Sequence, residues 1–421
     1  MDLIFLVRNH KLKLSQTRKI NNYMLCLYLL YRLPKIYIMK KIAFLTNSIF
    51  TCGGEQRVVC IIANELAKYH SVTIYTEDSP DLKNNPYNLS SSVQVFFHKP
   101  FSAGFFVKAF RFLLRLPVFS KLKNFNLTWK FAYYNKTLVA KLKNELDNKY
   151  DTMIAVSDRL SILLGFAKKS GLHSNVIGWE HNSFESYFRT PNHRLWKQDK
   201  LFIGAAKNFS HCVVLNEDYV KKYKEYLGLD AVAVYNPRSF VSEKKSLLDN
   251  KIIITCCVLD IEPKGLDLLL DSFEKFTSQN SDWKLQIIGD GADREKLEQL
   301  ALEKNIQDRI EFLGYRTDIK DLLLNASIFV LPSRWEGFPM ALTEAYECGL
   351  ATVFYDIPAT IPFRRNDSAL TCKCFDIDEF ADSLLRLAND KELRISLGRK
   401  AVDFSNSISI ENIVQQWLKI I

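Results

Sequence analysis

The feature that most constrains this chain is the alternation of short, nearly continuous apolar runs with helical stretches. Runs rich in β-branched and aromatic residues occur at 42–45, 72–75, 153–156, 176–179, 212–215, 252–256, 284–288, 310–313 and 328–331. Helix-like stretches include 57–68, 319–324, 341–348 and 377–387. Strands that lack polar alternation are buried on both faces, so this order predicts parallel sheets covered by helices.

The alternation restarts at residue 251, after an Asn236-Pro237-Arg238 turn and a mostly polar segment at 242–250. We therefore predict an α/β protein with two Rossmann-like domains, residues 39–235 and 251–405, which face each other across a cleft. Residues 406–421 have the apolar spacing of one more helix. A length of 421 residues suits this organisation, because domains usually span roughly 100–200 residues.

The first 38 residues carry seven basic residues and one acidic residue, and they precede Met39-Lys40-Lys41, which resembles the natural start of an α/β domain. Residues 1–38 are either an upstream extension outside the fold or a basic arm for a membrane surface. The apolar run 23–31 has no small-residue cleavage site after it, so we do not interpret it as a signal peptide. No apolar stretch reaches the ~20 residues of a membrane-spanning helix.

The cysteines argue against a metal site. The chain has nine cysteines and seven histidines, and no two cysteines form a Cys-x-x-Cys pair. A zinc site is therefore not expected. An odd number of scattered cysteines is typical of a reducing cytoplasm.

Two motifs of the first half follow predicted strands, where ligands of open α/β sheets bind. Gly53 and Gly54 follow the strand at 42–45; paired glycines allow close backbone approach, and the helix start offers N–H groups to an anion. A Gly-Gly pair alone is more often a simple turn, and the spacing matches neither a dinucleotide fingerprint nor a P-loop. His181 follows the strand at 176–179; a lone histidine is more often structural, and its position shifts this only modestly towards function.

Three motifs of the second half also follow strands. Lys264 lies in Pro263-Lys264-Gly265, where a point charge suits a diphosphate, although an ordinary surface lysine is the plainer alternative. Gly291 belongs to a glycine-rich turn after 284–288, which shapes a nucleotide site or is only a turn. The segment 331–345 contains two glutamates suited to accepting hydrogen bonds from sugar hydroxyls, although either one alone is more simply a loop or surface glutamate. The two glutamates are Glu336 and Glu344. Backbone amides at the start of the following helix favour anions, and these amides belong to Gly337, Phe338, Met340 and Ala341.

Taken together, these motifs resemble the retaining glycosyltransferases of the GT-B fold, in the large family 4 or group 1. The resemblance runs from about Met39 to the C-terminus and is strongest over 251–350, where the two glutamates are separated by seven residues and enclose Gly-Phe-Pro. It implies a role for each matching position. The implied catalytic residues are Glu336, at the donor sugar hydroxyls, and His181, near the reacting carbon. The implied donor-binding positions are Glu344 at the ribose, Lys264 at the diphosphate, the backbone near Tyr315 and Arg316 at the base, and Gly53 and Gly54 at the diphosphate and acceptor.

The resemblance also implies an activity. It indicates a metal-independent, retaining transferase without a cofactor, which takes a nucleotide-sugar, most simply a UDP-sugar. The implied acceptor is a lipid-linked or oligosaccharide chain of a growing surface polysaccharide, lipopolysaccharide or capsule, at the cytoplasmic face of a bacterial inner membrane. The alternatives are a GT-B nucleotide-sugar epimerase, a sucrose-type transferase, or a degenerate, non-catalytic partner of a glycan assembly complex.

Two departures from the family pattern bear on this activity. The family usually has an arginine five or six residues before the lysine, and this chain has Leu259 and Val258 there. The loop after Tyr355-Asp356 also lacks the common Gly-Pro-x-Glu pattern. Loss of a charge-assisted contact to the leaving group costs several kcal/mol of transition-state stabilisation. We therefore expect another cation to substitute, and the candidates are Arg334, Arg364 and Arg365.

The basic charge of the chain is concentrated in one stretch. Residues 99–143 contain ten basic residues, eleven aromatic residues and no acidic residue, whereas 231–421 contain 23 basic and 30 acidic residues. The segment 105–116 is amphipathic, with Lys108, Arg111 and Arg115 among apolar side chains, as in helices that lie on anionic membranes. The alternatives are a helical pair packed on the domain, and a nucleic-acid site. No RNA-recognition or helix-turn-helix pattern is evident, so we expect a peripheral membrane surface and no nucleic acid.

Overall fold

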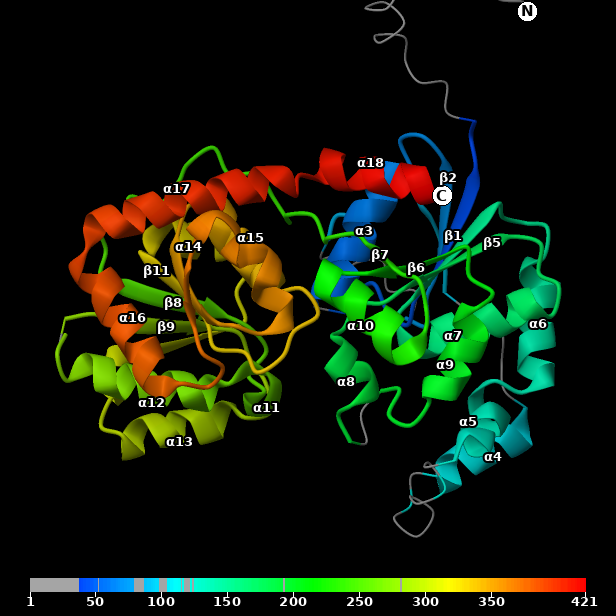
Figure 1. Cartoon of the computed structure of the whole chain (residues 1–421), viewed down its shortest axis with the longest axis horizontal. Coiled ribbons are helices and arrows are strands. Elements are labelled where there is room, and N and C mark those ends of the chain that lie inside the picture. Colours follow the sequence, from blue (N-terminus) through cyan, green and yellow to red (C-terminus); the bar gives the residue numbers. More distant parts are fainter. Residues whose placement is uncertain are drawn as a thin grey trace, which may run out of the picture. The chain divides into compact units, whose positions relative to one another are not determined.

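The structure is a computed structural model (Figure 1). It describes residues 38–51, 53–78, 87–97, 104–114, 116, 122, 125–191, 194–280 and 282–421. The predictions for residues 1–37 lie outside the described residues, and so does the one for Arg115.

The first half of the chain forms a parallel sheet of seven strands in the order β3-β2-β1-β4-β5-β6-β7. Four of its strands, β1, β2, β4 and β5, have at least four buried residues out of five, which is why the sequence shows unbroken apolar runs there. The strands are β1 (Lys41–Leu45), β2 (Ser71–Tyr75), β3 (Gln94–Phe96), β4 (Thr152–Val156), β5 (Asn175–Trp179), β6 (His211–Val214) and β7 (Val232–Ala233).

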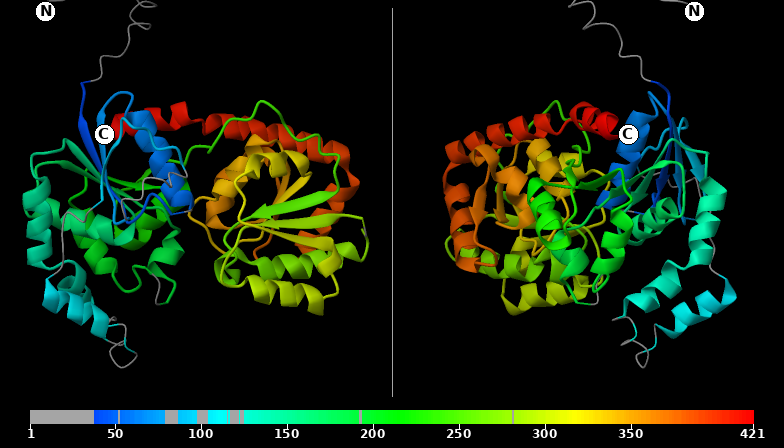
Figure 2. Two further views of the ribbon diagram at one scale, coloured as in Figure 1. Left: turned by 180° about the vertical axis from the view of Figure 1, so that it is seen from behind. Right: turned by 45° about the vertical axis from the view of Figure 1, so that its right-hand side comes forward.

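Helices cover both faces of this sheet, with α3 on one face and α7 and α9 on the other (Figures 1 and 2). Gly165 of α7 lies against the backbone of Ala205, where a Cβ would meet the carbonyl oxygen at 2.7 Å. The helices are α3 (Gly54–Leu66), α4 (Phe105–Leu113), α5 (Asn126–Tyr133), α6 (Lys136–Leu146), α7 (Asp158–Lys169), α8 (Phe184–Phe188), α9 (Asp199–Ala206) and α10 (Glu217–Leu227).

The second half forms a parallel sheet of six strands in the order β10-β9-β8-β11-β12-β13. Its strands are β8 (Ile252–Cys256), β9 (Lys284–Ile288), β10 (Ile310–Gly314), β11 (Ile328–Leu331), β12 (Ala351–Tyr355) and β13 (Leu370–Cys372). Its helices are α11 (Ile261–Lys264), α12 (Leu266–Thr277), α13 (Arg294–Glu303), α14 (Ile319–Asn325), α15 (Met340–Glu347), α16 (Ile377–Asn389), α17 (Lys391–Ser407), and the 3-10 helices η2 (Gln307–Arg309) and η3 (Pro358–Asp367).

Both sheets have a switch point, where the strand order reverses. The switch lies between β1 and β4 in the first sheet and between β8 and β11 in the second. The two parallel α/β sheets confirm the predicted fold class. Each of the nine predicted strands forms within about one residue of its expected bounds, whereas β3, β7, β12 and β13 were not predicted. Ligands of such sheets bind outside the carboxyl ends of the strands at the switch point.

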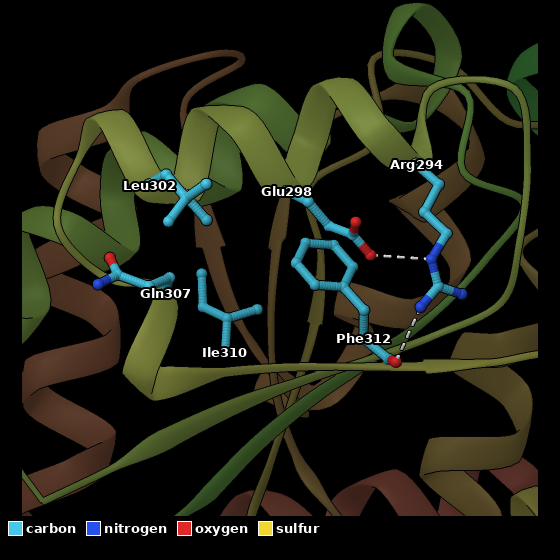
Figure 3. Close-up of a pocket in the computed structure, with 7 residues that line it drawn as sticks. Arg294, Glu298, Leu302, Gln307, Ile310 and Phe312 are labelled. Carbon is cyan, nitrogen blue, oxygen red and sulfur yellow. Dashed lines mark hydrogen bonds and ion pairs between the residues drawn. The ribbon is translucent and has the colours of Figure 1, made fainter.

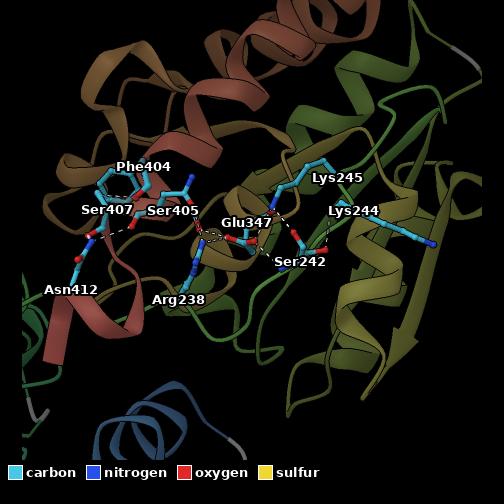
Figure 4. Close-up of polar contacts among 10 residues, drawn as sticks. Arg238, Ser242, Lys244, Lys245, Glu347, Phe404, Ser405, Ser407 and Asn412 are labelled. Atoms are coloured by element: carbon cyan, nitrogen blue, oxygen red, sulfur yellow. Dashed lines mark hydrogen bonds and ion pairs between the residues drawn. The ribbon is translucent and has the colours of Figure 1, made fainter. Parts of the chain in front are cut away.

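A buried carboxylate fixes the segment between the two sheets (Figure 4). Glu347, the last residue of α15, has only 2% of its side chain exposed. It accepts hydrogen bonds from Arg238 Nη1 at 2.7 Å, Lys245 Nζ at 2.8 Å, the Ser242 amide at 2.8 Å and Ser405 Oγ at 2.7 Å. The carboxylate therefore ties residues 238–245 and the end of α17 to α15.

The predicted final helix is α18 (Ile410–Ile420), and it contacts the first sheet and its helices. The ring of Trp417 lies 4.7 Å from that of Trp179, at the end of β5. The carbonyl oxygen of Ile421 accepts hydrogen bonds from Lys40 Nζ at 2.8 Å and Thr152 Oγ1 at 3.3 Å. The end of the chain is thus anchored at the first sheet.

The basic aromatic stretch contains α4, α5 and most of α6. Helix α4 has no buried residue, and 79% of Phe105 and 83% of Phe106 are exposed. It contacts α5 through the rings of Phe110 and Phe131, 5.1 Å apart. Arg111 points inward: its Nε donates to the Ala132 carbonyl at 2.7 Å. Within the described part of the chain, no helix has the length and apolarity to span a bilayer.

Candidate active site

Three predicted site residues, one catalytic and two donor-binding, follow strands on both sides of the second switch point. Lys264 ends α11, which comes after β8, and Glu336 lies in the loop between β11 and α15. Glu344 lies on α15. Because parallel strands end at one edge of a sheet, these residues share the edge where ligands bind.

Lys264 and Glu336 form a partly buried ion pair. The Lys264 Nζ lies 2.7 Å from Oε1 of Glu336, and Ser333 Oγ donates to the same oxygen at 2.9 Å. Burial lowers the pKa of Lys264, but the neighbouring Glu336 charge and the hydrogen bond to it raise it, and the net pKa is raised. The amine is therefore held as a cation beside a carboxylate, which suits a diphosphate next to sugar hydroxyls.

Glu344 forms an ion pair with Arg57. Arg57 lies on α3, a helix that packs on the first sheet. Glu344 is buried, and burial raises its pKa while Arg57 and Ser239 oppose that rise. Arg57 Nη1 also lies 3.4 Å from Ser239 Oγ. We did not predict Arg57 as a site residue. The only sequence signal was its place three residues after the Gly53-Gly54 pair.

The glycines of the two halves lie at close backbone approaches. A Cβ on Gly337 would meet the carbonyl oxygen of His181 at 2.0 Å, so only glycine fits there. A Cβ on Gly54 would lie 3.2 Å from Met340 Cγ, at the start of α15. The structure therefore brings together the Gly53-Gly54 turn, the loop of Glu336 and the first turn of α15, where a helix dipole favours anions.

The other residues predicted near this helix start have mixed roles. Met340 and Ala341 form the first turn of α15. The ring of Phe338 instead packs between those of Tyr235 and Phe363, at 5.7 and 5.0 Å. Its side chain therefore stabilises the loop, and only its backbone is available to a ligand.

His181 is buried beside this loop. Its ring lies 4.1 Å from that of Trp179, its amide donates to Tyr187 Oη at 3.2 Å, and its Nε2 has no hydrogen-bond partner in the described chain. Burial and then the charge of Arg194 lower its pKa to about 3. The imidazole is therefore neutral at physiological pH, and its Nε2 is buried without a hydrogen-bond partner among the described residues.

Acidic groups that we did not predict lie at Glu180, next to His181 in the sequence, and at Asp158, whose amide donates to Glu180 Oε2 at 3.2 Å. Burial raises the pKa of Glu180 to about 8, and one of its oxygens has no partner in the described chain. Ser157 Oγ donates to Glu55 Oε2 at 2.5 Å, and Arg194 Nη1 lies 3.0 Å from Asp158 Oδ2. Ser157 and Asp158 have positive φ angles of 66° and 31°, strain of the kind that occurs at functional sites. The only sequence signal for Ser157, Asp158 and Glu180 as site residues was that they directly follow predicted strands.

Gly291 and Arg316 lie at the same sheet edge but outside these ion pairs. A Cβ on Gly291 would meet the carbonyl oxygen of Leu259 at 2.4 Å, so the turn packs directly on the position where the family's arginine is expected. Arg316 Nε donates to Asp318 Oδ1 at 2.7 Å in a local, exposed pair. Tyr315, beside it, is 61% exposed.

The three arginines expected to supply a substitute cation each bind a carboxylate elsewhere. Arg334 holds both oxygens of Asp267, at 2.9 and 2.6 Å. Arg364 holds both oxygens of Asp356, at 2.7 and 2.6 Å. Arg365 Nη2 lies 3.2 Å from Glu217 Oε2. None of the three contacts Lys264, Glu336 or Glu344 among the described side chains.

The pocket in Figure 3 is separate from this site. It lies between α13 and β10, and Arg294 crosses it to Glu298 Oε1 at 2.9 Å and to the Phe312 carbonyl at 3.3 Å. None of its lining residues was predicted to bind a substrate. Among the side chains that the structure describes, no group of three or more His, Cys, Asp or Glu residues could hold a metal ion.

Comparison with known proteins agrees with this geometry. Residues 239–403 match the family model described as glycosyl transferases group 1. An uncharacterized glycosyltransferase of Haemophilus influenzae is 27% identical over 385 residues, which cover 90% of this chain and 99% of that protein. A Campylobacter jejuni relative is 25% identical over 91% of this chain and 98% of its own length. That relative is the GalNAc-α-(1→4)-GalNAc-α-(1→3)-diNAcBac-PP-undecaprenol α-1,4-N-acetyl-D-galactosaminyltransferase.

A solved structure decides the fold. The crystal structure of an S. aureus TarM variant, in complex with Fondaparinux, α-GlcNAc-glycerol and UDP, superposes with a TM-score of 0.70 at 16% identity. The match covers 91% of this chain and 99% of TarM. The fold is GT-B. Lys264, Glu336 and Glu344 all lie within residues 239–403, which match the group 1 glycosyl transferase model.

Proposed function

We propose that the protein is a glycosyltransferase that moves a sugar from a nucleotide-sugar to a glycan acceptor. The observation that carries this proposal is the Lys264–Glu336 pair, together with Glu344, at the carboxyl ends of β8 and β11. A cation there suits the leaving diphosphate, and the two carboxylates suit hydroxyls of the sugar and ribose. UDP is the nucleotide we propose, because it is the nucleotide in the TarM complex.

We propose that the chain belongs to family 4 and works with retention and without a metal ion. In this account, Lys264 and the start of α15 stabilise the negative charge that develops on the leaving diphosphate. The leaving phosphate helps to deprotonate the acceptor on the same face of the sugar, so no enzymic nucleophile is required. His181, neutral and next to Gly337, is placed to bind a hydroxyl near the reacting carbon.

For the acceptor we propose a lipid-linked or growing surface glycan. Support comes from the Campylobacter relative, whose name specifies an undecaprenyl diphosphate-linked acceptor. A peripheral site on the cytoplasmic face of the inner membrane would present such an acceptor. We propose that α4 and the following basic segment face that membrane, because α4 exposes Phe105, Phe106 and Phe112 and has no acidic neighbour within 99–143.

The test is nucleotide release from a panel of UDP-, GDP- and ADP-sugars, with an undecaprenyl diphosphate-linked glycan present. Wild type should release the nucleotide, and Glu336→Gln should lower the rate by about 100-fold or more, as loss of one transition-state contact does. Addition of EDTA should leave the rate unchanged, and the product anomer should match the donor anomer. Release from no donor at all would favour the second candidate, a non-catalytic assembly partner, for which the apolar Leu259 is the specific argument.

A further inference from the structure

The pair between Arg57 and Glu344 connects the two sheets at the proposed donor site. Arg57 lies one turn into α3, directly after the Gly53-Gly54 turn, and Glu344 lies on α15. Of the two side chains, 32% of Arg57 and 4% of Glu344 are exposed. The approach of Gly54 to Met340 brings the starts of the same two helices together. The Arg57–Glu344 pair is therefore accompanied by a second contact between α3 and α15, which joins the first residues of these helices.

Arg57 and Lys264 both lie near the end of β8. Cys256, the last residue of β8, has a pKa that burial raises; Glu344 raises it further, whereas the charges of Arg57 and Lys264 both lower it. Both cations therefore lie within electrostatic reach of the same thiol. Tyr315, which follows β10, is likewise close enough to raise the pKa of Arg57. A diphosphate bound at this strand end would lie near both cations.

The partner of Arg57 is a residue that the proposed function assigns to the substrate. If Glu344 binds the ribose, its contact with Arg57 must loosen when a nucleotide-sugar enters. The guanidinium would then be free beside a diphosphate, whose planar phosphate edges match its paired N–H donors. Arg334, Arg364 and Arg365 are instead paired with carboxylates that the proposed function does not assign to the substrate.

We propose that Arg57 is the second cation of the diphosphate site, supplied by the first sheet in place of the arginine that Leu259 replaces. In the nucleotide-free protein, Glu344 holds it in position. Donor binding exchanges this partner: the ribose takes Glu344, and Arg57 turns to the diphosphate. The inference rests on the proposed function, since it assumes a nucleotide-sugar at this edge of the second sheet.

The test compares UDP with uridine in isothermal titrations of the full-length protein. Arg57→Ala should weaken UDP binding by about tenfold or more, the size of a charge-assisted contact. It should leave uridine binding unchanged or tighter, because Glu344 is no longer occupied. Arg57→Lys should fall between wild type and Arg57→Ala for UDP. Arg364→Ala, which removes an arginine paired only with Asp356, is the matched control and should bind both ligands as wild type does.

Four results would overturn the inference. Equal loss of UDP and uridine affinity in Arg57→Ala would show that Arg57 only holds the helices together. Wild-type UDP affinity in Arg57→Ala, or a loss specific to UDP in Arg364→Ala, would assign the cation elsewhere and leave the proposed function intact. No binding of UDP to the wild-type protein would remove the proposed donor and the inference with it.

Discussion

Single residues at the proposed site owe their chemistry mainly to burial. Glu180 and His181 are neighbours in sequence, and both are more than nine-tenths buried. Burial raises the pKa of the acid to about 8 and, with Arg194, lowers that of the imidazole to about 3. Both groups are therefore neutral near pH 7. The sequence predicted His181 from its place after a strand, but burial depends on packing and could not be predicted from spacing.

Glu180 should make stability fall as the pH rises. Its folded-state pKa is raised, so the native protein keeps a proton that the unfolded chain loses above its ordinary value of 4.5. Between about pH 5 and 8, each pH unit then removes up to about 1.4 kcal/mol from the free energy of unfolding. Glu180→Gln should abolish this contribution. Urea unfolding at pH 6.5, 7 and 8 measures it. His181 opposes this slope, because the unfolded imidazole is half protonated at its ordinary pKa of 6.5 and the native one is neutral, but this contribution is the same in wild type and Glu180→Gln.

The control for this measurement is Glu303→Gln, at an exposed carboxylate that ends α13. It should keep the pH dependence of wild type. A wild-type slope in Glu180→Gln would mean that Glu180 is ionised in the native protein and that its burial is compensated.

Lys264 should contribute to binding and turnover, and Arg334 should not do so directly. Lys264→Ala leaves Glu336 without its cation and the diphosphate with one cation fewer, so we expect a loss of about 100-fold or more in kcat/KM for the nucleotide-sugar. Steady-state nucleotide release measures it. Arg334→Ala in the same loop region loses a pair with Asp267 and should keep kcat/KM within about threefold, provided that the protein remains folded. A larger loss in Arg334→Ala than in Lys264→Ala would contradict the assignment.

At the scale of elements, the sequence predicted the strands that form long buried apolar runs and missed most of the strands that do not. Strands such as β8 and β11 are continuous apolar runs and were predicted with their observed bounds. The unpredicted β3, β7 and β13 have three, two and three residues, and these short strands form with little apolar signal of their own. Strand β12 is fully buried, but it begins four residues after α15 ends, and the helical pattern obscured it.

The end of α15 should be a stability determinant through Glu347. Removal of this carboxylate leaves Arg238, 11% exposed, without its ionic partner, and breaking a buried pair costs about 3–5 kcal/mol. We expect Glu347→Ala to lower the free energy of unfolding by that order, measured by urea denaturation. Glu347→Gln should recover part of it through its amide oxygen. Destabilisation of less than about 1 kcal/mol would mean that water replaces the carboxylate.

Helix α4 should bind membranes without supporting the fold. Phe105→Ser with Phe106→Ser changes two side chains that are mostly exposed, so we expect the melting temperature to remain the same. Co-sedimentation with phosphatidylglycerol-containing vesicles should fall sharply, and wild-type binding should weaken as salt is raised. Val232→Ser with Leu302→Ser, at exposed apolar positions outside this stretch, is the control. Salt-insensitive or unchanged vesicle binding in the α4 variant would contradict a membrane role.

For the whole molecule, charge distribution is more informative than net charge. The chain has a formal charge of +10, yet residues 99–143 alone contain ten basic residues and no acidic one. Residues 239–403, which match the glycosyl transferase model, lie in an acidic half, so the proposed diphosphate binding would depend on a few placed groups. The sequence identified Lys264 and the two glutamates because their spacing is specific. Arg57 was missed because its pairing with Glu344 joins residues 287 positions apart.

The central claim is that a nucleotide diphosphate binds at the carboxyl edge of the second sheet. Isothermal titration of the wild-type protein and Lys264→Ala with UDP tests it most directly. We predict one UDP site in wild type and at least a tenfold weaker one in Lys264→Ala, about 1.4 kcal/mol of binding free energy. Equal UDP affinity in the two proteins, or no binding of UDP, GDP or ADP to wild type, would contradict the account.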